Sequence, residues 1–362
     1  MARVFNFAGG PATLPESVLE EAAGDIVEYS GRGYSILEMG HRTQDYAAVY
    51  EETTASLRKL MQIPEDYEIL FLHGGATLQF SMVPLNLLPN AGDKADYVIT
   101  GAWSKKAATE ASRFGDVHIA ATGEAQKFTE VPRLEKTAFR PDAEYIHVTT
   151  NNTIFGTRLV DLPPEEAGLL VGDMSSNILA EPVDVSRFGL IYAGAQKNIG
   201  TAGLCVVILR KDLVGRARKD TPVLLNYAVH VEKKSAYNTP PVFAVYLAGK
   251  VFDWALNEGG VAGLYQRNLQ KAKMVYRFLD HSKLFYPLVN GPERSLTNVT
   301  FRLKKPHLEK AFHEGAAIRG LVNLGGHRWV GGMRASMYNA MPVEGVAALV
   351  RYMTDFEAEN AG

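Results

Sequence analysis

The sequence predicts an α/β fold in which helices flank a large, mainly parallel sheet and a smaller α+β lobe forms much of the C-terminal third. With 362 residues, the chain exceeds the size at which a single hydrophobic core keeps growing, so two lobes are expected. Short apolar runs alternate with stretches of helical periodicity, which is typical of parallel sheets. Seven runs are candidate strands, at residues 68–72, 95–100, 117–121, 144–149, 169–172, 190–193 and 205–209.

Helical patterns account for most of the remaining sequence. Thr13 and Glu16 have the spacing of a capping box, so the first helix is expected to begin near Pro15. From about Gly260 a long helical pattern replaces the alternation of runs, and we place the smaller lobe there. Further patterns predict a helix at residues 45–61 and a strand at residues 297–303.

Composition restricts the class of protein. The chain is 46% hydrophobic and 22% charged, as globular proteins are, and its formal net charge of -2 gives no field that would attract nucleic acid. Its one cysteine, Cys205, excludes a disulfide within the chain and is expected to be buried in a strand. No signal peptide or membrane-spanning run is evident, so a cytoplasmic location is expected.

Chemically useful residues follow the ends of the predicted strands, where ligands bind in open α/β sheets. Gly74 and Gly75 form a turn into a helix, whose free N–H groups suit a phosphate, although a tight turn without a ligand explains them equally well. Trp103 follows another strand and could stack on a flat ring, although a tryptophan of the core is the commoner case.

Two further strand ends carry a carboxylate and a lysine. Asp173 follows the run at 169–172, where an acid is costly to bury unless it meets a cation, such as the pyridinium nitrogen of pyridoxal phosphate. A helix N-cap is the alternative. Lys197 lies between Gly194 and Gly200, where a lysine is usually solvated, but with Asp173 nearby it could form an imine. Together these residues match what pyridoxal phosphate requires.

A collinear set of motifs across nearly the whole chain resembles the phosphoserine aminotransferases, which are class V pyridoxal-phosphate-dependent aminotransferases. The motifs are FNFAGGP at 5–11, HR at 41–42, HGG at 73–75, DMSSN at 173–177, YAGAQKNIG at 192–200, NTPP at 238–241, GHR at 326–328 and GGMRASMYNA at 331–340. The resemblance implies the type I fold of these enzymes, with a seven-stranded sheet. It also implies a large domain at 16–263 and a small domain made of 1–15 and 264–362.

Residue by residue, the resemblance implies how the cofactor is held. Lys197 would form the internal aldimine, Asp173 would pair with the ring nitrogen, Trp103 would stack on the ring, and Thr153 would bond its phenolic oxygen. The phosphate ligands would be Ala76, Thr77, Ser175, Gln196 and, from the second subunit of a homodimer, Asn238 and Thr239. Some relatives have glycine and arginine in place of Ala76 and Thr77, which puts a charged contact there in doubt. No metal is expected.

The implied reaction transfers the amino group of L-glutamate to 3-phosphohydroxypyruvate, giving O-phospho-L-serine and 2-oxoglutarate by a ping-pong mechanism. Arg334 suits the carboxylate of the substrate, because guanidinium binds carboxylate through two parallel hydrogen bonds. The distal anion and the rest of the substrate site are assigned to Gly9, His41, Arg42, His327 and Arg328. The resemblance implies that His327 and Arg328 reach across the dimer interface. A surface salt bridge is the alternative for each arginine.

Other functions remain open on the sequence alone. A serine or alanine aminotransferase acting with glyoxylate would share Lys197 and Asp173 but not the distal basic pocket. A cysteine desulfurase would need an exposed cysteine, and a nicotinamide dehydrogenase would need a Gly-x-Gly-x-x-Gly turn, which Gly74 and Gly75 do not provide. A protein that only binds the cofactor would not react with glutamate. 4-Phosphohydroxythreonine is a further candidate substrate within the family.

Overall fold

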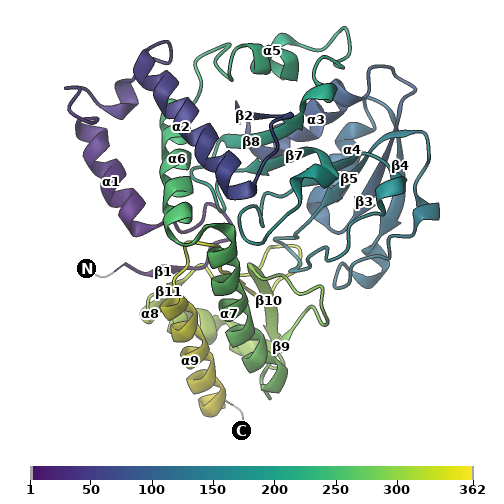
Figure 1. The fold of residues 1–362 in the computed structure, drawn as a ribbon. Helices are drawn as coiled ribbons and strands as arrows, with labels where there is room; N and C mark the ends of the chain where they lie inside the picture. The colour runs from purple at the N-terminus through teal and green to yellow at the C-terminus, as the bar shows by residue number, and fades with distance from the viewer. Residues whose placement is uncertain (1–2, 361–362) are drawn as a thin grey trace.

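The computed structural model describes residues 3–360, and its centre is a seven-stranded sheet (Figure 1). The strands lie in the order β2-β8-β7-β6-β5-β3-β4; β8 is antiparallel to both of its neighbours, and the other pairs are parallel. Each of the seven predicted runs forms one strand of this sheet. The strands are β2 (Tyr67–His73), β3 (Lys94–Ile99), β4 (Asp116–Thr122), β5 (Ala143–Thr149), β6 (Leu170–Asp173), β7 (Phe188–Gly194) and β8 (Leu204–Arg210).

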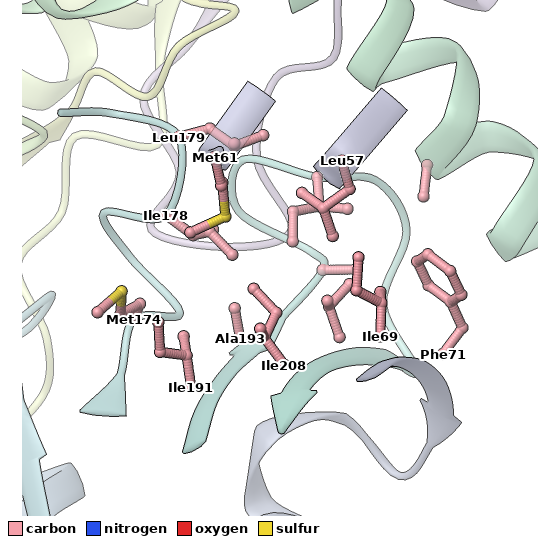
Figure 2. Close-up of a cluster of buried hydrophobic side chains, with 14 of the residues drawn as sticks. Leu57, Met61, Ile69, Phe71, Met174, Ile178, Leu179, Ile191, Ala193 and Ile208 are labelled. Carbon is pink, nitrogen blue, oxygen red and sulfur yellow. The ribbon is translucent and has the colours of Figure 1, made fainter. Parts of the chain in front are cut away.

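The central strands are continuous apolar runs because both faces of the sheet are covered. On one face, Ile69, Ile191 and Ile208 pack with Leu57 and Met61 of α2 (Figure 2). The residues between them along the strands point to the other face, where they pack with α3 and α4. The helices around the sheet are α1 (Glu16–Val27), α2 (Gln44–Met61), α3 (Gly75–Leu87), α4 (Ala102–Ala111), α5 (Tyr227–Glu232) and α6 (Val242–Asn257).

A smaller lobe follows, seen in green and yellow below the sheet in Figure 1. It has its own hydrophobic cluster, which Phe7 joins from the N-terminal segment. The predicted boundaries at residues 16 and 264 stay predictions; the helix that enters this lobe begins at Gly260. The elements are β1 (Phe5–Asn6), α7 (Gly260–His281), β9 (Phe285–Pro287), β10 (Asn298–Leu303), α8 (Glu309–Ile318), β11 (Leu321–Val322), β12 (Met333–Ser336) and α9 (Val343–Asn360).

Details of the fold test three of the sequence predictions. The first helix begins at Glu16, but the predicted capping box is wrong: the Thr13 hydroxyl donates to the Asn6 carbonyl at 2.9 Å, so it holds the N-terminal segment instead of the helix start. Cys205 is fully buried in β8, as predicted. Within residues 3–360, no helix combines the length and the apolar character needed to cross a membrane.

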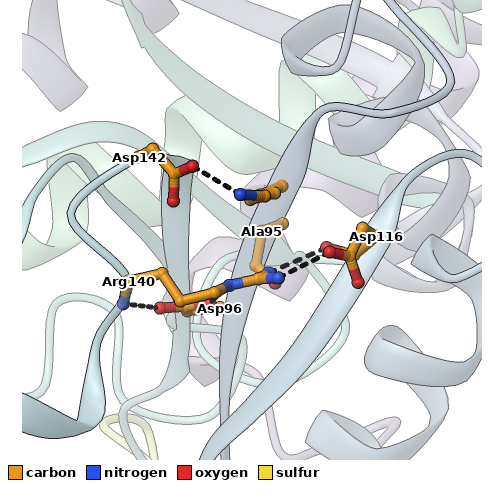
Figure 3. Close-up of polar contacts among 6 residues, drawn as sticks. Ala95, Asp96, Asp116, Arg140 and Asp142 are labelled. Carbon is orange, nitrogen blue, oxygen red and sulfur yellow. Dashed lines mark hydrogen bonds and ion pairs between the residues drawn. The ribbon is translucent and has the colours of Figure 1, made fainter.

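Arg140 links the paired strands β3 and β4 at the edge of the sheet by hydrogen bonds to both (Figure 3). Its Nε donates to Oδ1 of the fully buried Asp96 at 2.7 Å, and its Nη1 donates to Asp116 at 2.8 Å. A further bond, from Nη2, reaches the Ala95 carbonyl. A buried carboxylate is costly unless a cation meets it, so this pair balances a charge that the core could not otherwise hold.

Arg140→Ala is therefore expected to lower the free energy of unfolding by about 3 kcal/mol, because it leaves the buried Asp96 without its cation, with the N–H of residue 140 still donating to it. Asp116→Ala is the matched control. The Asp116 side chain is 57% exposed, so its loss should cost at most about 1 kcal/mol. Urea unfolding of the three proteins measures both values. Equal effects of the two substitutions would contradict the argument.

Candidate active site

A cavity of about 240 Å³ opens where strands of the sheet meet the first turns of α3 and α4. Parallel strands place their carboxyl ends at one edge, so residues distant in sequence converge there. Eight of the ten predicted cofactor-binding residues line this cavity: Ala76, Thr77, Trp103, Thr153, Asp173, Ser175, Gln196 and Lys197. The structure thus brings the predicted cofactor residues together.

Lys197 lies in the turn that follows β7, and its side chain lines the cavity. Its Nζ donates to Thr153 Oγ1 at 2.6 Å. Burial lowers the pKa of the amine to about 8, the nearby carboxylate of Asp173 opposes that shift, and the positive charge of Arg334 adds to it. Near neutral pH, an appreciable fraction of this amine is therefore neutral, which is the nucleophilic form.

Asp173 is the last residue of β6 and is 6% exposed. Burial raises the pKa of its carboxyl, and the hydrogen bonds from Ser175 and the charge of Lys197 oppose that rise. Ser175 donates twice to Oδ1, from its N–H at 2.9 Å and from its hydroxyl at 2.6 Å. A carboxylate accepts about four hydrogen bonds, so capacity remains for a cationic N–H from a ligand. The alternative role of helix N-cap is wrong, because no α-helix follows β6 directly.

Ser175 has a different environment from the one expected of a phosphate ligand. Its one hydroxyl hydrogen is directed at Asp173, and its oxygen accepts from the Gly194 N–H at 3.1 Å. In this arrangement Ser175 orients the carboxylate. Its predicted role as a phosphate ligand would require the hydroxyl to turn away from Asp173, and that role stays a prediction.

The start of α3 forms a cradle for an anion. Gly74 adopts φ +87°, which glycine allows at low cost, and the chain then turns into the helix at Gly75. The N–H groups of Ala76 and Thr77 belong to the first turn and have no acceptor within the helix. A Cβ added to Gly194 would lie 3.4 Å from the Ala76 nitrogen and 3.0 Å from Gln196 Oε1, so the ends of β7 and α3 converge there. This small concave space with backbone donors fits a phosphate group.

Trp103 lies in the first turn of α4, beside the cavity. Gly101 is the N-cap of this helix, and any Cβ there would clash with the Asn152 side chain at 1.7 Å. Asn152 is fixed in turn by a 2.9 Å bond to the Thr100 carbonyl. Trp103 also packs against the α3 and α4 side of the core, and its stacking on a flat ring stays a prediction.

The N-terminal segment and Arg334 close another side of the site. A Cβ on Gly9 would lie 2.3 Å from Arg334 Nη2, and a Cβ on Gly10 would lie 3.3 Å from Lys197 Cγ. Arg334 Nη1 donates to the Thr153 carbonyl at 3.3 Å, while its buried Nε has no hydrogen-bond partner among residues 3–360. This unpaired donor and the closeness to Lys197 fit a site for the carboxylate of an amino acid.

The remaining predicted residues do not line this cavity. Arg42, Asn238 and Thr239 are exposed, and His41 is partly buried. His327 lies within electrostatic reach of Arg334 of its own chain, so it does not need a second subunit to approach this site. Partial burial and the positive charges of Arg334, Arg328 and Lys106 lower the pKa of His327.

One residue close to the site was not singled out from the sequence. Tyr338 is buried, and its hydroxyl donates to the Gly9 carbonyl at 2.9 Å and accepts from Asn298 at 3.1 Å. It therefore holds Gly9 against Arg334. The string GGMRASMYNA contains Tyr338, but nothing in its spacing distinguishes this tyrosine from an ordinary core residue.

Comparison with known proteins agrees with this geometry. The model of the family described as aminotransferase class V matches residues 4–349. The chain belongs to the class V aminotransferases. Members of this family use pyridoxal phosphate, and the residues around the cavity fit that cofactor: an amine, a carboxylate, an indole and a phosphate cradle. The chain is accordingly a pyridoxal-phosphate-dependent aminotransferase.

Within the class V aminotransferases, several similar proteins are named phosphoserine aminotransferase. The phosphoserine aminotransferase of Bacillus cereus is 51% identical over 360 residues, which cover 99% of this chain and 100% of that one. The corresponding chloroplast protein of Arabidopsis thaliana is 47% identical and is covered to 84%. The solved phosphoserine aminotransferase of Bacillus circulans subsp. alkalophilus is 44% identical with a TM-score of 0.95, and 99% of each chain is covered. The pyridoxal-phosphate-bound structure from Trichomonas vaginalis is 36% identical with a TM-score of 0.90, covering 97% and 100% of the two chains.

The pKa of Lys197 predicts how the rate at which this class V aminotransferase captures its cofactor depends on pH. Capture of pyridoxal phosphate by the cofactor-free protein requires the neutral amine, so its rate should rise about tenfold per pH unit below about pH 8 and level off above it. The charge of Asp173 raises this pKa, so Asp173→Asn should move the midpoint to lower pH. Stopped-flow absorbance at a series of pH values measures both midpoints. A midpoint near 10.5, the ordinary value for lysine, would contradict the burial argument.

Proposed function

We propose that the chain transfers the amino group of L-glutamate to 3-phosphohydroxypyruvate, giving O-phospho-L-serine and 2-oxoglutarate. One observation carries this proposal: Lys197, Asp173 and the phosphate cradle line one cavity beside Arg334, in a chain about half identical over its full length to phosphoserine aminotransferases. When bound, pyridoxal phosphate supplies an electron sink and carries the amino group between two half-reactions.

The residues of this chain divide the chemistry among them. Arg334 orients the substrate by binding its carboxylate through two parallel hydrogen bonds. Lys197 then moves one proton between the substrate α-carbon and the C4′ carbon of the cofactor, as base in one direction and as acid in the other. Its pKa of about 8 suits both roles near neutral pH, because the amine can accept and return the proton.

Asp173 has an electrostatic role. Its carboxylate would hold a proton on the ring nitrogen of the cofactor, and this proton favours the flow of electrons from the α-carbon into the ring. Ser175 fixes the carboxylate through its two hydrogen bonds to Oδ1. Trp103 and Thr153 would hold the ring in place, one by stacking and the other by a bond to the phenolic oxygen.

The distal anion of the substrate distinguishes this function from that of a serine or alanine aminotransferase. His327 and Arg328 lie on the segment that precedes β12, and His327 is close to Arg334. His41 and Arg42 would complete the pocket in a homodimer, in which Asn238 and Thr239, exposed here, would reach the phosphate cradle of the second subunit. The homodimer, its shared sites and a cytoplasmic location stay predictions, as does the use of 4-phosphohydroxythreonine.

A two-step experiment tests the proposed function. The cofactor-loaded protein is mixed with L-glutamate, and the visible spectrum and the release of 2-oxoglutarate are followed. 3-Phosphohydroxypyruvate is then added, and we expect the spectrum to return and phosphoserine to appear. Hydroxypyruvate and glyoxylate serve as matched acceptors without phosphate. An equal or greater kcat/KM with either of them would favour the serine or alanine enzyme and contradict the proposal.

A further inference from the structure

Lys106 has an unusual position in the molecule, next to two tryptophans. It follows Trp103 by one turn on α4, and its Nζ lies 4.7 Å from the centroid of the Trp103 ring. The same Nζ lies 5.4 Å from the centroid of the Trp329 ring, which comes from the segment between β11 and β12. An ammonium group is attracted to the face of an indole within about 6 Å, so Lys106 bridges the two rings.

The segment that carries Trp329 is the one assigned to the distal anion. The His327 ring meets the Trp329 ring edge-on, with centroids 4.8 Å apart, and the Arg328 guanidinium lies 5.8 Å from the Trp329 centroid. Trp329 therefore contacts Lys106 on α4 and both His327 and Arg328 of its own segment. Its position fixes where His327 and Arg328 stand relative to Trp103.

These basic side chains lack carboxylate partners. Among residues 3–360, neither Lys106, His327, Arg328 nor Arg334 has a carboxylate oxygen within ion-pair distance. By contrast, the neighbouring Lys105 pairs with Glu124 at 2.5 Å, in the ordinary manner of a surface lysine. Like charges repel, so the proximity of Lys106, Arg328 and Arg334 is unfavourable unless an anion binds among them. This arrangement therefore favours an anionic ligand.

The space beside Lys106 adjoins the cofactor site. A cavity of about 860 Å³ is lined by Lys106 and Trp329, and it shares Gly74, Thr77 and Phe80 with the cavity that Asp173 and Lys197 line. Lys106 therefore lies beside the site of the reacting groups, in contact with Trp103, which lines the smaller cavity.

We propose that Lys106, held between Trp103 and Trp329, is a positioning residue that fastens the His327 segment over the active site and so determines the preference for a phosphorylated acceptor. The proposal rests on the proposed function, because the anion that it serves is the phosphate of the acceptor. Lys106 acts through Trp329 on His327 and Arg328, and its charge adds to theirs.

Kinetics of matched variants test this inference. Lys106→Met keeps the length of the side chain and removes the charge, so KM for 3-phosphohydroxypyruvate should rise about tenfold. KM for L-glutamate, whose side-chain carboxylate would occupy the same distal site with less charge than a phosphate, should rise less, and kcat should change less than about twofold. Lys106→Arg should remain within about threefold of wild type, because guanidinium also stacks on indole. Lys105→Met, which removes the same charge one residue away, should leave all three constants unchanged.

Limited proteolysis gives a readout that needs no substrate. Trypsin cleaves after Arg328, and release of the segment should make this cleavage several-fold faster in Lys106→Met than in wild type or Lys105→Met. An unchanged KM for the phosphorylated acceptor in Lys106→Met, or an equal rise in Lys105→Met, would overturn the inference. If the wild-type protein showed no preference for the phosphorylated acceptor, the proposed function would fail instead, and the trypsin comparison would still report whether Lys106 holds the segment.

Discussion

Lys197→Ala is expected to reduce the rate of amino transfer by about 10⁴-fold, the upper range for the loss of a general acid–base group. The lysine is the group that moves the proton, and no other amine lines the cavity among residues 3–360. The half-reaction with L-glutamate should show the loss directly, since release of 2-oxoglutarate can be followed in a single turnover.

Two controls separate this chemical role from a loss of structure. A small primary amine added to Lys197→Ala should restore part of the rate, because it can enter the space left by the side chain and carry the proton. Thermal unfolding should show that the variant is folded, since Lys197 makes only one hydrogen bond, to Thr153, in the described structure. An undiminished rate in Lys197→Ala would remove the basis of the proposed function.

Asp173→Asn is expected to reduce kcat/KM by about 10²–10³-fold, the range found when one preorganised electrostatic group is removed from an active site. The amide has the shape of the carboxylate but no charge, so it cannot hold a proton on the ring nitrogen. Ser175→Ala is the graded control. It removes one of two hydrogen bonds to Oδ1, and a loss of about tenfold is expected.

The comparison between these two variants also tests the role assigned to Ser175. If the serine mainly held the phosphate, Ser175→Ala would weaken the affinity for pyridoxal phosphate more than it slowed the reaction. If it orients Asp173, the reaction should slow while affinity changes little. Equilibrium dialysis of the cofactor, alongside kcat, distinguishes the two cases. An Asp173→Asn protein with at least half of the wild-type kcat/KM would contradict the electrostatic role of the carboxylate.

The sequence predicted the strands well because their signal is local. A strand buried on both faces is a continuous apolar run, as β6, β7 and β8 are, and even the largely exposed edge strand β4 has a short apolar run. The order of the strands could not be predicted in the same way. Nothing in residues 205–209 indicates that β8 lies between β2 and β7 and runs antiparallel to both, because that pairing depends on contacts far apart in the chain.

In the site, likewise, residues marked by their place in the sequence could be predicted, whereas contacts between distant side chains could not. Asp173 and Lys197 could be identified because each lies at or shortly after the end of a strand. The contacts of Ser175 with Asp173 and of Lys106 with Trp329 could not, since they depend on side-chain geometry. Lys271 is a further example: it lies in a helical pattern where a lysine is expected in solvent, yet it is 1% exposed and donates to three backbone carbonyls, of Met337, Tyr338 and Met341.

The pairing of β1 with β11 has a consequence for the order in which the enzyme is built during synthesis. Phe5 pairs with Leu321 and Asn6 with Val322, so the segment that carries Gly9 and Gly10 to Arg334 and Lys197 must wait for a strand more than 300 residues later. At about 5–20 residues per second, the ribosome takes roughly 15–60 seconds to reach that strand. The large sheet can form during this interval, but the nascent chain gains a complete catalytic centre only when translation is nearly finished.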